Sequence, residues 1–233
     1  WRLNDKVQVP AADLAINSGS QGATGDGFYV GAATHPVPGA LVAGSDTAAS
    51  FDATAGTVVS VPYSAAMNPR PAFSVEVWLN PNVENAAGTL TCALASGQFA
   101  SPRSVWLIYQ SDTGWNFRMY NQNGTATSVN ITGGPAPVAG TWHHVVAVYD
   151  GTTALVYVNG VQAVSGTPTG YVPSAGGPLF IGGRSDSSFW WNGSADELAI
   201  YGKALTASEI DAHYKNGISA SPATSYNQLV LNS

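Results

Sequence analysis

Residues 73–80, with the sequence FSVEVWLN, alternate between apolar positions and mixed positions. Successive side chains of a β-strand point to opposite faces of the sheet, so this segment presents one apolar face and one mixed face. The apolar positions are Phe73, Val75, Val77 and Leu79, and the mixed positions are Ser74, Glu76, Trp78 and Asn80. The pattern predicts a strand with one face in a core and the other face half polar.

A second alternation runs through residues 104–121, on both sides of the turn sequence SDTG at residues 111–114. Two strands joined by a short turn that contains glycine form an antiparallel hairpin. After the turn, apolar positions alternate with polar or amphipathic ones, namely Trp115, Phe117 and Met119 with Asn116, Arg118 and Tyr120. We therefore expect a hairpin that also has one face in the core.

Residues 145–149 and 155–158 are apolar at nearly every position, and each segment is followed by a turn sequence, Asp-Gly or Asn-Gly. A strand with no polar face is covered on both sides. Residues 206–214 form one short expected helix, whereas the first 35 residues are rich in glycine and are expected to form loops at the sandwich edge. Two packed antiparallel sheets satisfy these patterns.

The chain is thus expected to be an all-β protein with one domain over residues 1–217. Residues 218–233 begin with a run of small residues, GISASPATS. Such composition is typical of linkers and tails. We expect this segment to be a tail or the junction to a following repeat.

The amino-acid composition argues against nucleic-acid binding and against membrane insertion. Only 9% of the 233 residues are charged, the formal net charge is −6, and the eight Lys and Arg residues are scattered singly, so no basic stripe is available for nucleic acid. Cys92 is the only cysteine, which excludes an intrachain disulfide. No apolar run approaches the ~20 residues that span a bilayer, so no membrane insertion is expected. A surface of short polar side chains is common in secreted bacterial sandwiches, and we expect an extracellular or cell-surface location.

Five short sequences follow one another between residues 142 and 210: WHHVVAVYDG, YVNG, IGG, NGSADELAIY and ALTASEI. In this order they resemble the laminin-G-like modules of the concanavalin A-like lectin and glucanase superfamily. FSVEVWLNP at residues 73–81 and PGALVAGSDTAASFD at residues 38–52 extend the resemblance over nearly the whole chain. It implies a concanavalin A-like jelly-roll sandwich of two antiparallel sheets with one short C-terminal helix. It also implies a large extracellular bacterial protein, with adjacent domains of the same polypeptide as partners.

The resemblance also allows a test for catalysis. Glucanases of the superfamily resemble one another by a Glu-x-Asp-x-x-Glu run on one strand, and retaining hydrolysis needs two carboxyl groups about 5 to 5.5 Å apart. The four glutamates of this chain form no such run; they are Glu76, Glu84, Glu197 and Glu209. Asp196 and Glu197 are adjacent, so in a regular strand they point to opposite faces. We expect no hydrolase activity and no catalytic residue.

Calcium is the cofactor that the resemblance implies, through Asp196 in the G-x-x-D-E segment at residues 193–197. Family members often hold a structural Ca²⁺ with this aspartate and oxygen ligands from the glycine-rich N-terminal loop, where Asn17 and Asp26 are the expected ligands. Calcium prefers such hard oxygen donors. The alternative is that Asp196 accepts backbone N–H groups and braces a loop without metal. His143 and His144 point to opposite faces of their strand and are expected to be structural.

Aromatic side chains supply the candidate ligand contacts. One group lies in the loop before Asn192, where at least one indole is expected to be partly exposed, and the other lies in the hairpin of residues 104–121. The candidate ligand-binding residues are Trp190, Trp191, Tyr109, Trp115, Arg118 and Tyr120. Ring faces stack on the C–H face of a sugar, and amide or guanidinium donors bind its hydroxyl groups. The alternative for each ring is packing in the core.

Two functions fit these patterns. The first is a non-catalytic, lectin-like module that binds a polysaccharide or other glycan. The second is a structural or adhesive repeat of a large secreted or cell-surface protein, with no glycan ligand. Exposed coplanar aromatic rings in an open groove favour the first, whereas buried aromatic rings and well-packed termini favour the second.

Overall fold

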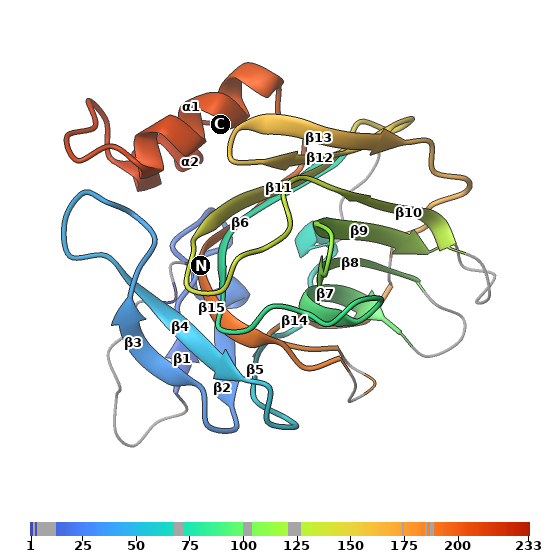
Figure 1. The fold of residues 1–233 in the computed structure, drawn as a ribbon, viewed down its shortest axis with the longest axis horizontal. Helices are drawn as coiled ribbons and strands as arrows, with labels where there is room; N and C mark the ends of the chain where they lie inside the picture. Colours follow the sequence, from blue (N-terminus) through green and yellow to red (C-terminus); the bar gives the residue numbers. More distant parts are fainter. Residues whose placement is uncertain are drawn as a thin grey trace.

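The computed structural model of the protein describes residues 1, 3, 13–67, 72–99, 104–120, 127–173, 175–184, 186 and 189–233. Over these residues two antiparallel sheets pack face to face (Figure 1). The eight-stranded sheet has the order β1 (Leu14–Ala15), β2 (Gly27–Val30), β5 (Val58–Val61), β14 (Leu179–Ile181), β7 (Leu90–Gln98), β8 (Ser104–Ser111), β9 (Trp115–Tyr120) and β10 (Thr127–Gly133). The seven-stranded sheet has the order β13 (Val161–Gly166), β12 (Ala154–Val158), β11 (His143–Tyr149), β6 (Phe73–Pro81), β15 (Asn192–Tyr201), β4 (Thr47–Asp52) and β3 (Thr34–Pro38). This confirms the predicted all-β sandwich.

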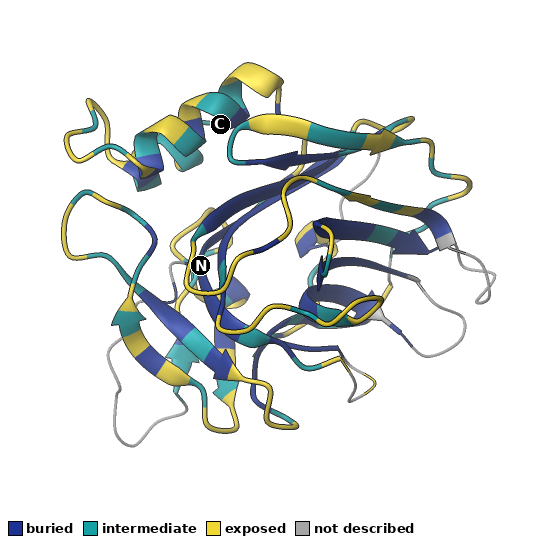
Figure 2. Cartoon of the chain, viewed as in Figure 1, coloured by how far each residue is buried: buried dark blue, intermediate teal, exposed yellow. Residues whose placement is uncertain are grey.

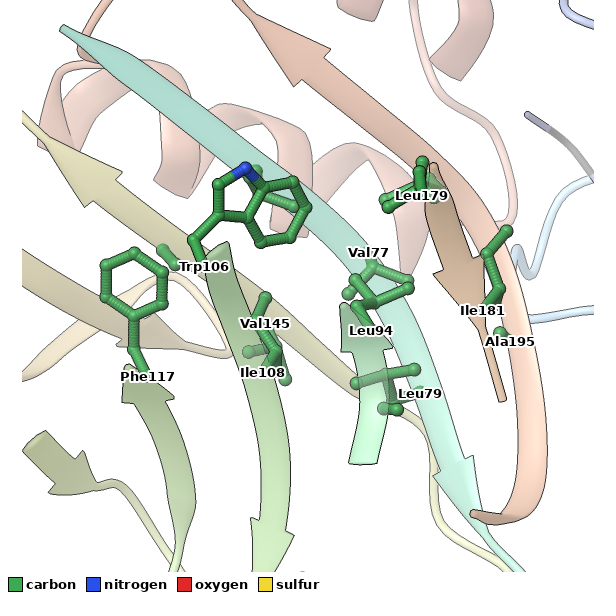
Figure 3. Close-up of a cluster of buried hydrophobic side chains, with 14 of the residues drawn as sticks. Val77, Leu79, Leu94, Trp106, Ile108, Phe117, Val145, Leu179, Ile181 and Ala195 are labelled. Carbon is green, nitrogen blue, oxygen red and sulfur yellow. The ribbon is translucent and has the colours of Figure 1, made fainter. Parts of the chain in front are cut away.

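The core lies between the two sheets and is built by the alternation that the sequence shows (Figure 3). Val77 and Leu79 of β6 face Leu94, Ile108 and Phe117 of the other sheet, and all five side chains are buried. Burial of such a side chain stabilises the fold by about 1.5 to 3 kcal/mol. The predicted apolar faces of β6 and of the β8–β9 hairpin are therefore confirmed.

Helix α1 (Ala207–Gly217) confirms the predicted short helix and extends it by three residues. Its N-terminus is fixed by a capping box, in which the Thr206 hydroxyl accepts the Glu209 N–H and the Glu209 carboxylate accepts the Thr206 N–H. Ile210 on its inner face is buried together with Val146 and Val148 of the seven-stranded sheet. Helix α1 therefore covers the outer face of that sheet, and this explains why β11 has no polar face.

Helix α2 (Tyr226–Asn232) corrects the prediction that residues 218–233 are a linker or tail, and it is a second C-terminal helix where one was expected. Ser225 caps it, and Tyr226 is only 4% exposed. The Tyr226 hydroxyl accepts a hydrogen bond from Trp78 Nε1 at 2.9 Å and donates to Glu76 Oε1 at 2.5 Å. Because these partners lie on β6, α2 is part of the domain.

The N-terminal region also differs from the prediction of loops. β2 pairs with β5 on one side and with β1 on the other, and β3 forms the edge of the seven-stranded sheet beside β4. Two 3₁₀ turns, Gly22–Gly25 and Ala65–Met67, lie between strands. Figure 2 shows the buried positions concentrated in the central strands, whereas the edge strands β3 and β13 carry exposed positions.

Candidate functional site

The outer face of the eight-stranded sheet carries a second, smaller cluster of side chains on β7, β8 and β9. Alternation places Tyr109 and Arg118 on this face, opposite the core residues Ile108 and Phe117. Five residues, which we call the arginine–aromatic cluster, contact one another there: Phe99, Tyr109, Arg118, Arg184 and Phe189. This cluster is the part of the described surface where aromatic rings and guanidinium groups meet.

Arg184 holds the cluster together. Its Cζ atom lies 3.9 Å from the ring centre of Phe99 and 4.1 Å from that of Phe189. Nη1 donates to the Tyr109 hydroxyl at 2.9 Å, and Nε and Nη2 form a two-pronged pair with the Asp186 carboxylate at 2.9 and 2.5 Å. Burial lowers the pKa of Arg184, but the bonds to Asp186 and Tyr109 outweigh burial and raise it. The charge of Arg184 is therefore fixed and already neutralised inside the protein.

Phe189 is the exposed ring of the cluster. It is 42% exposed and lies edge-on to Tyr109, with 6.1 Å between the ring centres. Its backbone has φ 61°, and its carbonyl accepts the Cys92 N–H at 2.7 Å. This bond fixes the backbone of Phe189 to β7. Phe189 is not among the candidates chosen from the sequence, although it directly precedes the two candidate tryptophans.

The tryptophans of this loop are less available than expected. Trp190 is half-buried and packs on Gly183, where an added Cβ would lie 2.4 Å from the indole. Trp191 is fully buried, and its Nε1 donates to Gln110 Oε1 at 2.9 Å. The expectation that at least one indole is partly exposed is met by Trp190, while Trp191 belongs to the core.

Three hairpin residues proposed as ligand contacts are buried as well. Trp115 is fully buried between the sheets, as its place in the apolar alternation already indicated. Tyr109 is buried because Arg118 and Arg184 lie against it, and burial raises the pKa of its hydroxyl. Tyr120 is 6% exposed and packs edge-on against Phe99. This corrects the prediction for Tyr109, Trp115 and Tyr120, so Arg118 is the only partly exposed member of the four hairpin candidates.

A second candidate site is a group of three carboxylates, Asp46, Asp196 and Glu197, whose oxygen atoms lie within 4.8 Å of one another. The register of β15 against β6 shifts between Asp196 and Ala199, and Glu197 has φ 48°. This irregularity corrects the prediction that Asp196 and Glu197 point to opposite faces. A β-bulge breaks the two-residue period and re-aims side chains in this way.

The structure also changes the expected partners of Asp196. Asn17 donates its backbone N–H to Asp26 Oδ1 at 2.7 Å, and its side-chain oxygen accepts the Gly19 N–H at 2.7 Å. Asn17 and Asp26 therefore brace their own loop, and Asp46 is the residue brought beside Asp196. The sequence offers no signal for Asp46, because its loop is brought to β15 by tertiary packing.

The Asp196 carboxylate is fully buried. Its Oδ2 accepts the Ala40 N–H at 2.9 Å, and its Oδ1 accepts the Glu197 N–H at 2.8 Å. Burial and the neighbouring Asp46 raise its pKa well above the ordinary value. Clustered hard oxygens with too much negative charge for a buried site fit a divalent cation such as Ca²⁺.

Glu76, the one glutamate on β6, is the centre of a buried polar network. His144 Nε2 and Tyr226 bind Oε1 at 2.8 and 2.5 Å, and His213 Nδ1 and Tyr201 bind Oε2 at 2.8 and 2.7 Å. Burial raises the pKa of Glu76, but the two histidines outweigh burial and lower it. A carboxylate with no exposed surface under two helices has no access to a substrate.

The two adjacent histidines point to opposite faces of β11, as predicted. His144 faces the Glu76 network, whereas His143 lies edge-on to Trp115 with 5.7 Å between the ring centres. Burial lowers the pKa of His143. The two imidazoles thus cannot bind one metal ion together.

A cavity of about 420 Å³ lies elsewhere, between Trp1, the loop at residues 17–21, the end of β15 and helix α2. Its charged lining residues are Glu197 and Lys203, and Lys203 is paired with Glu209 at 2.7 Å. The Tyr201 hydroxyl that lies near it is bound to Glu76. The cavity therefore offers no free cluster of donors beside an exposed ring. Within the described residues, neither α-helix is long and apolar enough to cross a bilayer.

The sequence profile Laminin_G_3, described as the concanavalin A-like lectin/glucanases superfamily, matches residues 52–211. The chain belongs to this superfamily. The match covers most of the sandwich, from the last residue of β4 to the middle of α1, and confirms the predicted resemblance. Comparison of this Laminin_G_3 chain with curated proteins gave no match.

Solved structures resemble the Laminin_G_3 chain at low sequence identity. Domain 4 of AbnA, a GH43 extracellular arabinanase from Geobacillus stearothermophilus in complex with arabinotriose, is 19% identical with a TM-score of 0.60, over 87% of this chain and 98% of that chain. The binding domain of botulinum neurotoxin serotype G is 12% identical with a TM-score of 0.65, over 86% of this chain and 48% of that chain. The binding domain of Paraclostridial Mosquitocidal Protein 1 is 15% identical with a TM-score of 0.59, over 87% of this chain and 51% of that chain. The chain thus spans about half the length of these two toxin structures, and the likeness concerns the fold.

Proposed function

We propose that this chain is a non-catalytic, extracellular glycan-binding module whose binding face is the outer face of the eight-stranded sheet. The observation that carries the proposal is the arginine–aromatic cluster, in which the exposed ring of Phe189 and the half-buried guanidinium of Arg118 both contact the Tyr109 ring. A ring face and a fixed donor are the two elements that a sugar needs. The fold likeness to an arabinanase domain in complex with arabinotriose supports a glycan as the ligand.

The carboxylates of the domain are not arranged for glycoside hydrolysis. Glu76 is inaccessible and bound by four donors, and the other carboxylate group, Asp46 with Asp196 and Glu197, contains a fully buried aspartate whose oxygens accept backbone N–H groups. Neither arrangement presents an acid and a nucleophile on opposite sides of a bound glycosidic bond. The domain therefore binds without cleaving.

A single site of this kind is weak. Stacking on Phe189 contributes about 0.5 to 1.5 kcal/mol, and a few hydrogen bonds must offset the cost of association. Such a sum corresponds to a Kd near millimolar, or about −4 kcal/mol. The apparent affinity rises when several such modules in one polypeptide bind the same polysaccharide at the same time.

Affinity electrophoresis against a broad set of soluble polysaccharides tests the proposal. Phe189→Ala should abolish the retardation that a bound polysaccharide causes. Phe28→Ala is the matched control, because Phe28 is 41% exposed but lies on β2, which β5 and β14 separate from β7. Retardation that Phe189→Ala leaves unchanged would place any glycan site on another face.

We also propose that the domain holds a structural Ca²⁺ through Asp46, Asp196 and Glu197. The support is the cluster of oxygens within 4.8 Å and the pKa of Asp196, which burial and the neighbouring carboxylates raise; a divalent cation bound there would offset both effects. When bound, the ion would fasten the loop that carries Asp46 to the bulge of β15. This role is distinct from ligand binding, since none of the three residues belongs to the arginine–aromatic cluster.

The second candidate function is a structural or adhesive repeat that binds no glycan. Burial of Trp191, Trp115 and Tyr109 favours it, as do the packed ends of the chain. Trp1 Nε1 donates to the Gly25 carbonyl at 2.8 Å, and the Trp1 carbonyl accepts the Leu198 N–H at 2.9 Å. Absence of retardation by every polysaccharide tested would favour this function over the first.

A further inference from the structure

Arg118 differs from every other lysine or arginine in the described part of the chain. Those others are Arg184, Lys203 and Lys215, and each forms an ion pair, with Asp186, Glu209 and Asp211 respectively. Arg118 pairs with no carboxylate of the described residues, although the formal net charge of the chain is −6. A cation with no partner among the described carboxylates of such an acidic protein favours a negative group on a ligand.

The Arg118 guanidinium is also held in place on one edge only. Its Nε donates to Asn116 Oδ1 at 2.9 Å and to Asn130 Oδ1 at 3.1 Å. The Asn116 amide is oriented in turn, because its Nδ2 donates to Asn130 Oδ1 and to Thr132 Oγ1, each at 2.8 Å. The guanidinium carbon lies 4.9 Å from the ring centre of Tyr109. The hydrogen bonds that Arg118 donates to amide oxygens on two strands, together with the ring contact, thus fix the group before any ligand arrives.

The opposite edge, formed by Nη1 and Nη2, makes no hydrogen bond to the described residues. This edge is the fork that matches the two oxygens of a carboxylate. The neighbouring Arg184 does not compete for such a group, because its Nε and Nη2 atoms already donate to the Asp186 carboxylate. Distant acidic residues repel a polyanion weakly, since charges are screened within about 8 Å at physiological salt.

We infer that Arg118 is a carboxylate subsite and that the ligand is an acidic, uronate-bearing glycan. This inference rests on the proposed glycan-binding function and narrows its substrate class. The sugar ring stacks on Phe189, and its carboxylate binds the free edge of the Arg118 guanidinium. Phe189 and Arg118 both contact Tyr109, so one short oligosaccharide reaches both.

The test uses two ligands that differ only in the carboxylate: oligogalacturonate and its methyl ester. Calorimetry on the whole chain should give a Kd at least tenfold lower for the acid than for the ester, which equals about 1.4 kcal/mol. Arg118→Gln should remove this preference, and Arg118→Lys should restore it only in part because an ammonium group has no planar fork. Lys215→Gln is the control for net charge, since the Lys215 side chain is 68% exposed and lies on α1. Thermal melting of each variant confirms that it is folded.

The outcomes separate the inference from the proposed function. Equal binding of acid and ester overturns the carboxylate subsite and leaves glycan binding standing. Equal loss of acid binding in Arg118→Gln and Lys215→Gln also overturns it, because the effect is then one of net charge. Failure of polygalacturonate, alginate, hyaluronan and every neutral polysaccharide to bind overturns both. A preference for the acid that only the Arg118 variants lose supports both.

Discussion

Replacing Glu76 by Gln tests whether the buried polar network stabilises the domain. The carboxylate accepts four hydrogen bonds, from His144, His213, Tyr201 and Tyr226, which lie on β11, α1, β15 and α2. An amide of the same size removes the charge and replaces one acceptor oxygen by an N–H₂ donor. At least two of the four donors then lose their acceptor inside a region that water does not reach.

The magnitude follows from the burial of the group. Glu76 is 0% exposed, and breaking a buried charged pair by changing one partner costs about 3 to 5 kcal/mol. For a domain of this size about 1 kcal/mol shifts the Tm by 2 to 4 °C. Glu76→Gln should therefore lower the Tm by roughly 6 to 20 °C. The loss should appear in urea unfolding as a lower midpoint with an unchanged slope.

The pH dependence has a defined sign. The pKa of Glu76 is lower in the folded protein than its ordinary value of 4.5. A depressed pKa contributes stability that is fully present above the unfolded-state pKa and is lost as the pH falls through the folded-state pKa. The gap in unfolding free energy between wild type and Glu76→Gln should hence shrink as the pH falls below the ordinary pKa of a glutamate.

Glu84→Gln is the matched control, because Glu84 is exposed in the loop after β6. Surface changes of this kind shift stability by less than about 0.5 kcal/mol. If Glu76→Gln and Glu84→Gln unfold at the same urea concentration, the network is not a source of stability and the reasoning fails.

Two further predictions concern the metal and the chemistry. Calcium should raise the Tm of protein from which a chelator has removed all metal. At a hundredfold excess over Kd, binding adds about 2.7 kcal/mol to the free energy of unfolding, and Asp196→Asn should abolish this gain. Equal Tm values with and without calcium would refute the proposed calcium site. The domain should release no reducing ends from arabinan, β-glucan or polygalacturonate, because Glu76 is inaccessible and the carboxylate group of Asp46, Asp196 and Glu197 contains a buried aspartate whose oxygens are bound by backbone N–H groups. Release above a heat-denatured control would contradict the non-catalytic assignment.

The strands were predictable because their residues repeat with a period that only a sheet satisfies. Val77 and Leu79 lie in the core where alternation placed them, and the capping pair of Thr206 and Glu209 fixes the start of a helix within the predicted range. Alternation also contained the correction for Trp115, which shares the apolar face of β9 with Phe117. Trp115 was assigned as a ligand contact because it is aromatic, although its position on the strand predicted burial.

Helix α2 could not be predicted in the same way. It has seven residues, about two turns, and Tyr226 is its one buried residue in the described structure. Two turns give too few repeats for an amphipathic pattern, and isolated helices of this length are unstable in water. Its stability comes from the contacts of Tyr226 with Trp78 and Glu76, which lie about 150 residues earlier in the sequence.

The carboxylate cluster depended on one backbone irregularity. Glu197 adopts φ 48°, a left-handed backbone conformation that is uncommon for residues other than glycine. The sequence Asp-Glu does not predict this conformation. Once the bulge forms, Asp196 and Glu197 turn toward Asp46 from a loop 150 residues away in sequence. Local periodicity describes regular strands, so a site built on an irregular one escapes it.

The two outer faces of the sandwich differ in how their charges are satisfied. On the seven-stranded sheet, α1 and α2 cover Glu76 and supply it with a full set of donors, so that charge serves the fold. On the eight-stranded sheet, Arg184 forms an ion pair with Asp186. Arg118 donates Nε to two side-chain amide oxygens, but its Nη1 and Nη2 atoms have no partner among the described residues. Fixing a long side chain costs up to about 2 kcal/mol of conformational entropy, and among the described residues no carboxylate adds an ion pair to offset this cost for Arg118. That cost is offset when a ligand carboxylate binds the ordered guanidinium, and this is why the outer face of the eight-stranded sheet is the side of the domain on which to look for a ligand.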